Sequence, residues 1–481
     1  MFVVTLQARA QPMQAVAAGC LRGVVGGARV GRWSTWPPRR LAVARGSRFH
    51  SDPTTPPKPI SEGRCCASRR APGVSFLRAT LSSTAAAAAD GDPSAVPPGE
   101  RVCLLDMSER EMQQWVESLG ERRYRAQQLW RWLYHVPQRV PFEHMTDIKR
   151  EFRERLGQCA RQHALGAERV HAAADGTQKI TFELQRRSGT IESVWIPADG
   201  RNTLCISSQL GCAMNCQFCF TAKMGLSAHL TTGEIVDQVL RARELFERPD
   251  EDPATRLGNV VFMGMGEPLH NVDNVLRAVD ILLHDKGLHL SHNKVTVSTA
   301  GLVPEMRRYL RESRAHLAVS LNATTDEVRS WIMPINRKYP IAQLMETLRE
   351  EYAQGHRRGD KVFIEYVLLH EVNDTLQDAQ RLLQLTAHVP CKINLIPFNA
   401  HVGTEFRPSP LERVEAFRAH LHRRGATVTV RRQRGDDKMA ACGQLGCPGE
   451  RSTPPRMRVP SAFRHAVHAN APRTGGRVVG A

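Results

Sequence analysis

Short apolar runs and amphipathic helical runs alternate through most of the chain, and this alternation restricts its fold more than any other feature. The apolar runs have strand length, whereas the runs between them repeat apolar residues every three to four positions. Such βα alternation predicts an α/β protein with a parallel sheet in a barrel or partial barrel, with its chemistry at the carboxyl ends of the strands. The expected strands are 179–184, 191–196, 204–206, 260–263, 295–298, 317–321, 362–369, 393–397 and 428–430, and the expected helices are 232–246, 272–283, 341–352, 376–385 and 411–424.

Three cysteines stand close together directly after one expected strand. The chain has 12 cysteines in 481 residues, too few for a disulfide framework. Cys212, Cys216 and Cys219 lie in the stretch GCAMNCQFCF. Three thiolates on one loop can bind three irons of a four-iron cubane and leave the fourth iron open to an exogenous ligand. The spacing therefore predicts a catalytic iron–sulfur cluster.

Zinc is the competing metal for these cysteines. A structural zinc site takes four protein ligands, and no second Cys or His pair stands nearby at finger spacing. His229 could supply a fourth ligand, although one histidine ten residues on is more often incidental. The iron–sulfur interpretation is favoured, and a zinc site stays open as the alternative.

The cysteine loop resembles the CxxxCxxC hallmark of the radical S-adenosylmethionine superfamily. A glycine-rich stretch, VVFMGMGEP from Val260 to Pro268, resembles the motif that binds the amino group of the cofactor there, although alone it would be a weak turn signal. The resemblance narrows to the RlmN/Cfr family of RNA adenine methyltransferases over nearly all of 104–445. The supporting stretches are LCISSQLGCAMNCQFC, FMGMGEPLHN, VTVSTAG, SLNATTDEVR, MPINRKYP, INLIPFN and RGDDKMAACGQL.

The family resemblance implies methylation of C2 of an adenine in large-subunit ribosomal RNA and in transfer RNA. It also implies one [4Fe-4S] cluster and two molecules of S-adenosylmethionine per turnover. C2 has no lone pair with which to attack a sulfonium methyl group, so a radical route is needed. In the family mechanism one cofactor molecule methylates a cysteine, here Cys442. A 5′-deoxyadenosyl radical from the second molecule then activates that S-methyl group. Glu192 matches the base that removes the C2 proton, and Cys205 matches the cysteine that releases the product through a transient disulfide.

The remaining cofactor contacts are implied by motif position. One departure is visible, because some family members have His where this chain has Asn322. Both side chains can hydrogen-bond a hydroxyl or a carboxylate, but only the contact of His would depend on pH near neutrality. The implied cofactor-binding residues are Gly266, Glu267, Ser298, Ser320, Leu321, Asn322 and Asn399.

The segment before the sheet predicts a small helical module. Ser108 and Glu111 form a capping box, and further amphipathic runs cover 122–135 and 147–156. Arginines stand among Trp and Tyr residues in these runs, which suits RNA because guanidinium groups neutralise phosphate and aromatic faces stack on bases. Core packing of the aromatic residues is the alternative. The resemblance implies a helical RNA-binding domain over 100–165 and a radical core over 166–445.

Both ends of the chain are basic and lack apolar periodicity. Residues 1–99 carry a net charge of +9 and few acids, which predicts an organellar transit peptide followed by a linker, both disordered. The basic segment 446–481 is predicted to be a disordered tail. The expected location is a chloroplast or mitochondrion, or the cytoplasm if the first segment is not cleaved. No run is long and apolar enough for a membrane span, so no membrane is expected as a partner.

The family chemistry also predicts partners and alternatives. The expected partners are ribosomal and transfer RNA, an electron donor such as flavodoxin or ferredoxin, and a disulfide reductant. A Cfr-type enzyme that methylates C8 of adenine would share the cysteines and is the first alternative. A zinc-bearing RNA-binding factor without methyl transfer is the second.

Overall fold

The computed structural model describes residues 101–136, 138–198, 200–247, 256–446 and 456–467. The predicted transit peptide and linker over 1–99 lie outside these residues. The segment that follows residue 101 begins with three helices, as the sequence predicted. Ser108 Oγ accepts from Glu111 N and the Glu111 carboxylate accepts from Ser108 N, which is the expected capping box. The helices are α2 (Glu109–Ser118), α3 (Tyr124–Tyr134) and α4 (Arg150–Cys159), and the strands β1 (Val102–Cys103) and β2 (Ala160–Arg161) pair beside them.

Most of the aromatic side chains of this helical module belong to its core. Trp130 and Tyr134 are 2% and 1% exposed, so they pack inside and are not available to stack on bases. Tyr124 is 47% exposed, and the Arg125 guanidinium lies 4.9 Å from its ring centre. Helix α4 begins later than predicted because the Asp147 carboxylate accepts a 2.6 Å hydrogen bond from Trp132 Nε1 instead of capping the helix.

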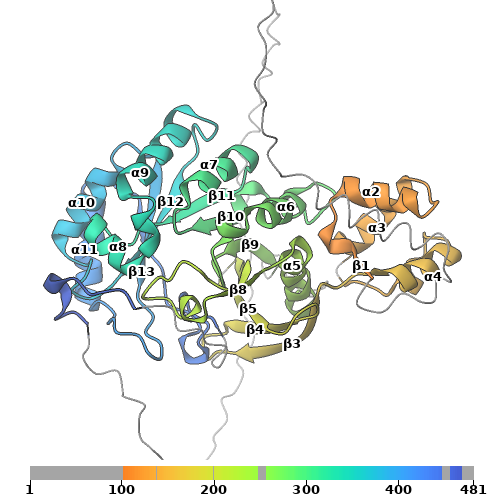
Figure 1. Ribbon diagram of the computed structural model, residues 1–481, viewed down its shortest axis with the longest axis horizontal. Helices are drawn as coiled ribbons and strands as arrows, with labels where there is room; N and C mark the ends of the chain where they lie inside the picture. The colour runs from red at the N-terminus through yellow and green to blue at the C-terminus, as the bar shows by residue number, and fades with distance from the viewer. Residues whose placement is uncertain (1–100, 137, 199, 248–255, 447–455, 468–481) are drawn as a thin grey trace, which may run out of the picture. The chain divides into compact units, whose positions relative to one another are not determined.

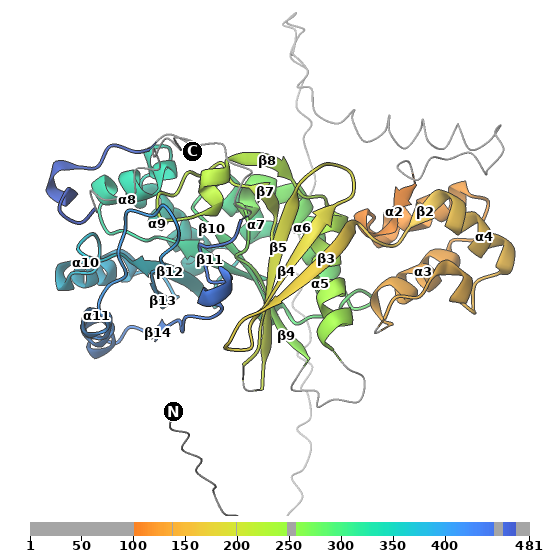
Figure 2. The same cartoon turned by 90° about the horizontal axis from the view of Figure 1, so that it is seen from below.

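A ten-stranded sheet runs through the described residues that follow the helical module (Figure 1). Seven neighbouring strands are parallel, and three antiparallel strands extend the sheet at one edge, where Figure 2 shows them side by side. The parallel strands are β6 (Asn202–Cys205), β9 (Leu257–Phe262), β10 (Val295–Thr299), β11 (His316–Ser320), β12 (Val362–Leu368), β13 (Cys391–Pro397) and β14 (Val428–Val430). The antiparallel strands are β5 (Thr190–Ile196), β4 (Gln178–Leu184) and β3 (Leu165–Ala172), and a separate short pair consists of β7 (Gln209–Gly211) and β8 (Leu226–His229).

Helices follow the parallel strands and cover the outer face of the sheet (Figure 1). This arrangement confirms the predicted partial barrel of βα units. The sequence missed α7 and α8, and it placed α5, α6, α9, α10 and α11 within a few residues of their observed bounds. The helices are α5 (Thr232–Phe246), α6 (Val272–Leu283), α7 (Val303–Glu312), α8 (Asp326–Ile332), α9 (Ile341–Arg349), α10 (Leu376–Thr386) and α11 (Leu411–Arg423). None of the helices in the described ranges is long and apolar enough to cross a bilayer.

The chain after β14 returns to the other edge of the sheet. Gly435 N donates to Asp175 Oδ2 at 3.0 Å, and Ala174 N donates to Asp437 Oδ2 at 3.2 Å, so this segment is tied to the turn between β3 and β4. The connection carries the following residues, including Cys442, across the carboxyl ends of the parallel strands. A cavity forms between this segment and the strand ends.

The prediction of a disordered tail over 446–481 is wrong for residues 456–467. Ala466 is 1% exposed, and the Phe463 ring lies 5.6 Å from that of Trp331 in α8. Met457 N donates to Gln217 Oε1 in the cysteine loop at 3.1 Å. The segment packs because its scattered apolar residues, without helical period, still cover an apolar cluster on the core.

Candidate active site

The cavity at the carboxyl ends of the strands contains about 910 Å³ of space not filled by protein atoms, part of it open to solvent. Its walls come from the cysteine loop, the glycine-rich loop after β9, the ends of β10 to β13, and the segment after β14. The position agrees with the rule that barrel enzymes carry their chemistry at this edge. The residues implied by sequence that line it are Cys212, Cys216, Cys219, Gly266, Glu267, Ser298, Ser320, Asn322 and Cys442.

The cysteine loop is shaped by close backbone contacts. Gly211 has a φ of +77°, and a Cβ on it would lie 1.8 Å from Gly225 O, so only glycine fits where the loop begins. Cys212 N then donates to Gly225 O at 2.7 Å. Burial, followed by the charges of the neighbouring cysteines, raises the pKa of the Cys212 and Cys216 thiols. A bound cation would be needed to stabilise them as thiolates.

The arrangement fits a cluster better than a zinc ion. Within the described ranges, no three His, Cys, Asp or Glu side chains converge closely enough to share one metal ion. Three thiolates that bind different irons of a cubane do not meet at a single point, so three cysteines around one cavity still suit a [4Fe-4S] cluster. His229 hydrogen-bonds Gln209 Nε2 at 3.0 Å and lies against His270, which removes the support for a fourth zinc ligand.

The glycine-rich loop after β9 holds a buried carboxylate. Glu267 is 4% exposed, its Oε2 accepts from Ala300 N at 2.7 Å, and its Oε1 accepts from Leu269 N at 3.1 Å. Burial raises the pKa of Glu267 to about 7 despite these donors. Gly266 has a φ of +100°, and a Cβ there would lie 2.5 Å from Gln209 Cβ. The glycine therefore lets the loop pack against the chain that follows β6.

Two implied cofactor contacts do not line the cavity within the described residues. Leu321 is fully buried, and only its backbone faces polar groups, since its carbonyl accepts from Arg329 Nε at 2.9 Å. Asn399 Nδ2 donates to Cys442 O at 3.0 Å, so Asn399 supports the segment that carries the cysteine. Asn322 reaches the cavity, but its Oδ1 already accepts from Val367 N at 2.9 Å.

The two cysteines outside the loop differ in access. Cys442 is exposed to the cavity, although the protein around it still raises the pKa of its thiol. Cys205 is 6% exposed, and burial raises the pKa of its thiol to about 12. The Arg431 guanidinium faces both sulfurs and opposes this rise in both pKa values. The two thiols thus share one cationic neighbour.

Glu192 is buried in β5 and already has two partners. Its Oε1 lies 3.1 Å from Lys179 Nζ, and its Oε2 accepts from Gly446 N at 2.8 Å. Leu445, the residue before Gly446, lines the cavity. The segment 445–446 therefore lies between the Glu192 carboxylate and the cavity.

Sequence reasoning missed two charged residues of the cavity. Glu365 is 4% exposed, its Oε1 accepts from Asn394 Nδ2 at 2.8 Å, and its Oε2 has no partner in the described part of the protein. Arg431, after β14, lines the same cavity. A single acid within the apolar run VFIEYVL was the signal that could have indicated Glu365.

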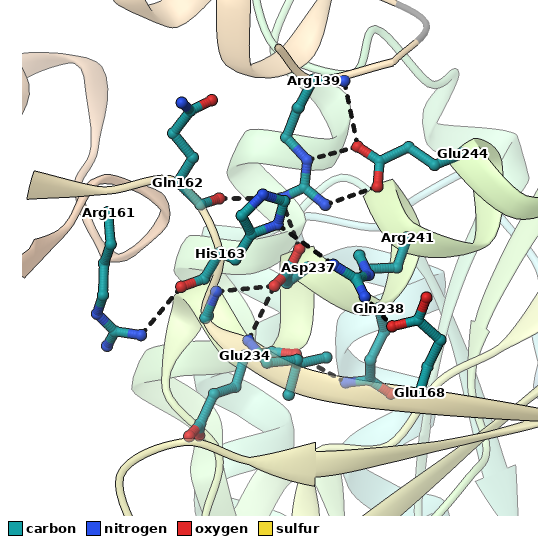
Figure 3. A network of polar contacts seen from close by, with 12 residues as sticks. Arg139, Arg161, Gln162, His163, Glu168, Glu234, Asp237, Gln238, Arg241 and Glu244 are labelled. Atoms are coloured by element: carbon teal, nitrogen blue, oxygen red, sulfur yellow. Dashed lines mark hydrogen bonds and ion pairs between the residues drawn. The ribbon is translucent and has the colours of Figure 1, made fainter. Parts of the chain in front are cut away.

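A buried polar network fixes the helical module to α5, the helix that follows the cysteine loop (Figure 3). Arg139 is the centre of this network, with a side chain 2% exposed, and it donates to Asp237 Oδ1 and Glu244 Oε1, both at 2.6 Å. Asp237 Oδ2 accepts from Ala164 N and Leu165 N at 2.7 and 2.9 Å. Removing any partner would leave buried charge without compensation.

Comparisons with known proteins agree with this fold and site. The family model for the ribosomal RNA large subunit methyltransferase N-terminal domain matches residues 102–161, and that for the radical SAM superfamily matches residues 206–383. The dual-specificity RNA methyltransferase RlmN of Geobacter sulfurreducens is 50% identical over 342 residues, covering 71% of this chain and 91% of that protein. The protein of the same name from Pelobacter propionicus is 47% identical over 347 residues, covering 72% and 96%.

A solved structure gives the same answer. The crystal structure of a radical SAM methyltransferase from Sphaerobacter thermophilus matches with a TM-score of 0.66 and 38% identity, covering 71% of this chain and 98% of that one. The fold and the cysteine loop thus define a radical SAM enzyme, a SAM-dependent methyltransferase. The chain belongs to the RlmN family of RNA methyltransferases, whose members use a [4Fe-4S] cluster and S-adenosylmethionine.

Proposed function

We propose that the protein methylates C2 of adenine in large-subunit ribosomal RNA and in transfer RNA, with Cys442 as the carrier of the methyl group. The observation that carries this proposal is that the Cys442 thiol lines the same cavity as Cys212, Cys216 and Cys219. A carrier thiol beside a radical source suits a carbon that cannot attack an ordinary methyl donor. The names of the bacterial relatives support RNA as the substrate.

The cofactor roles follow the cavity lining. Cys212, Cys216 and Cys219 would hold the cluster, and S-adenosylmethionine would contact a second set of lining residues. When bound, these two cofactors supply the methyl group and the one-electron chemistry that C2 requires. Leu321 and Asn399 support this site through their backbone and through the Cys442 carbonyl, respectively. The proposed contacts of S-adenosylmethionine are Gly266, Glu267, Ser298, Ser320 and Asn322.

The side chains of the protein carry the remaining steps. Cys442 Sγ loses its proton and accepts the methyl group, and after one hydrogen atom is removed from that group its carbon bonds to C2. Glu192 then accepts the C2 proton. The Cys205 thiolate attacks Cys442 Sγ and breaks the bond from that sulfur to the carbon on C2, which takes up a proton and becomes the methyl group. The unpaired electron left on the two sulfurs passes to the one-electron acceptor that the cluster would provide, and an external dithiol reduces the resulting disulfide. A donor such as flavodoxin or ferredoxin supplies electrons to the cluster.

The base role of Glu192 requires a local movement. Gly446 N occupies Oε2, and Lys179 faces Oε1. The segment 445–446 must therefore release Oε2 when RNA enters, after which the carboxylate can reach a substrate proton. Until RNA binds, the positive charge of Lys179 compensates the negative charge of the Glu192 carboxylate.

The test is anaerobic reconstitution with iron and sulfide, followed by mass spectrometry of ribosomal and transfer RNA nucleosides after incubation with S-adenosylmethionine and a reductant. We expect 2-methyladenosine from the unmodified protein and none from Cys442→Ser. Appearance of 8-methyladenosine would instead identify a Cfr-type C8 enzyme. A colourless, zinc-containing protein that binds RNA without methylating it would reject the proposal.

RNA binding and location are parts of the same proposal. The helical module would contact RNA through Tyr124 and the exposed Arg110, Arg122 and Arg123. The basic, acid-poor segment 1–99 supports delivery to an organelle. Fusion of residues 1–99 to a fluorescent protein tests this location, and uniform cytoplasmic fluorescence would reject it.

A further inference from the structure

Arg329, in α8, is a fully buried arginine that lies beside the proposed cofactor site. It has no exposed surface, and its guanidinium makes four hydrogen bonds. Nε donates to Leu321 O at 2.9 Å, and Nη1 donates to Asn336 Oδ1 at 3.0 Å. Nη2 donates to Ala300 O at 2.7 Å and to Ser320 O at 3.1 Å. All four acceptors are neutral.

A buried guanidinium normally faces a carboxylate, because an uncompensated charge in the interior is costly. In the described part of the chain no carboxylate forms an ion pair with Arg329. Asp326 is reached only through the Asn336 side chain, whose Nδ2 donates to Asp326 Oδ1 at 2.8 Å. Gln217 N, next to Cys216, donates to Ile332 O in α8 at 2.9 Å, so the helix that carries Arg329 contacts the cysteine loop. A guanidinium stays protonated at neutral pH, so Arg329 brings a positive charge to this contact.

The peptides that Arg329 holds are those of the cofactor site. The carbonyl of Ala300 accepts from Arg329, and the N–H of the same residue donates to Glu267 Oε2 at 2.7 Å. The arginine thus acts on Glu267 through one residue. Its other carbonyl partners are Ser320, the last residue of β11, and Leu321, the residue after it. One side chain therefore connects the ends of two strands and the glycine-rich loop.

We propose that Arg329 is a positioning residue of the cofactor site, which fixes Glu267 through Ala300 and supplies the positive charge that faces the Cys216 ligand of the cluster. This inference rests on the proposed function. A cubane with cysteinate ligands is anionic, and reduction adds a further negative charge. A nearby cation without a carboxylate partner stabilises the reduced state and makes the cluster easier to reduce.

Arg357 provides a matched control at the other end of the same strand. It is 4% exposed and donates to the carbonyls of Ser313 and Ala315, just before β11. Unlike Arg329, it has a carboxylate partner, because Nε donates to Asp360 Oδ2 at 2.8 Å. A purely structural role predicts similar consequences for both arginines. A role at the cofactor site predicts different ones.

The experiment compares Arg329→Lys and Arg329→Gln with Arg357→Lys and Arg357→Gln in the full-length, reconstituted protein. Three quantities are measured: the midpoint potential of the cluster by EPR-monitored titration, the dissociation constant of S-adenosylmethionine by calorimetry, and the midpoint of thermal unfolding. We expect Arg329→Gln to shift the potential to more negative values and to weaken cofactor binding by roughly tenfold or more. Arg329→Lys keeps the charge, so it should restore the potential while binding stays weakened.

The Arg357 variants should unfold at lower temperature but keep the potential and the dissociation constant of the unmodified protein. The inference fails if Arg329→Gln and Arg329→Lys both keep the original potential and affinity, or if the Arg357 variants shift them equally. If Arg329→Gln does not fold, Arg329→Lys decides through the dissociation constant alone. An unmodified protein that binds neither cluster nor S-adenosylmethionine would instead defeat the proposed function, and this inference with it.

Discussion

The two ends of the parallel strands differ in whether their buried charged side chains have partners of opposite charge. At the amino ends, Arg357 is paired with Asp360, and Glu351 Oε1 lies 3.0 and 3.3 Å from two arginines, although Glu351 Oε2 accepts no hydrogen bond from the described residues. At the carboxyl ends, Arg329 has only neutral acceptors, and Glu365 Oε2 has no partner among the described residues. Both ends belong to the same sheet, so the difference does not come from the fold class.

The charged groups at the amino ends serve the folded structure, whereas Arg329 and Glu365 at the carboxyl ends lie at the proposed cofactor site. Charges compensated inside the protein add little to the free energy of the folded chain on its own. Charges left with neutral partners raise it, and a bound ligand can recover that cost. Arg329 and Glu365 therefore carry a free-energy cost at the cavity, which bound anionic and polar cofactors could offset. Variants at the two ends should differ accordingly.

The largest expected effect is the loss of turnover in Cys442→Ser. A hydroxyl cannot carry the methyl group as a thioether, so we expect methylation to fall by about a thousandfold or more while the cluster absorbance is unchanged. Nucleoside mass spectrometry measures the product. Cys391→Ser, at the amino end of β13, is the control and should keep full turnover. Methylation that survives in Cys442→Ser would contradict the role of this thiol, at the carboxyl ends of the strands, as carrier of the methyl group.

The next effect concerns the amino ends. Arg357→Met leaves the Asp360 carboxylate and three backbone carbonyls without their donor. The Asp360 side chain is 45% exposed, so water compensates most of its lost ion pair, and the loss comes mainly from the buried carbonyls. A buried acceptor left without a donor costs about 1–3 kcal/mol, and we expect a loss of about 2–3 kcal/mol in the free energy of unfolding. Urea denaturation of the full-length protein measures it. A loss below about 1 kcal/mol would contradict the idea that this end is held together by internal pairing.

A smaller effect is expected in the pH dependence of cofactor binding. The pKa of Glu267 is about 7, so the carboxyl is mostly protonated at pH 6 and ionised at pH 8. If the ionised form accepts from the cofactor amino group, affinity for S-adenosylmethionine should rise about tenfold across this interval. Calorimetry at several pH values measures the rise, and Glu267→Gln should flatten it. Equal affinity at pH 6 and pH 8 in the unmodified protein would exclude this contact.

The smallest effect is a gain in stability. Burial raises the pKa of Glu365, so the ionised form is penalised at pH 8, and the penalty disappears as the pH falls and the group is protonated. Glu365→Gln should therefore raise the free energy of unfolding by about 1 kcal/mol at pH 8 and by less at pH 5. Glu351→Gln at the amino end should lower it, since two ion pairs are lost. Denaturation at both pH values measures the free energy of unfolding of each variant. A change of the same sign in Glu365→Gln and Glu351→Gln would contradict the proposed difference between the two ends of the sheet.

Much of the fold could be predicted because local periodicity determines it. Helices α5 and α6 and strand β14 have the predicted bounds, and the capping box at Ser108 is present. Strand β3 escaped prediction because most of its side chains are exposed and it lacks apolar alternation. Helix α8 has seven residues, too few for a clear period. The packing of residues 456–467 depends on a surface formed by distant parts of the chain.

The candidate site divides in the same way. The cysteine loop and the glycine-rich loop could be found because their residues are neighbours in sequence. Arg329 and Glu365 could not be assigned, since a single arginine in a helix or a single acid in a strand usually faces water. What each residue faces depends on strands that pair across long sequence separations. The two partners of Glu192 likewise come from β4 and from the segment after Cys442.

The packing of residues 456–467 has a consequence for the order of events during synthesis. Met457 N binds Gln217 in the cysteine loop, and Phe463 packs against Trp331. The loop itself is complete once residue 219 has left the ribosome, more than two hundred residues earlier. The surroundings of the loop are complete only when residues 456–467 have been made and have packed against it. In the nascent protein, the cysteine loop therefore stays open to the delivery of iron and sulfide until residues 456–467 have been made and have folded onto it.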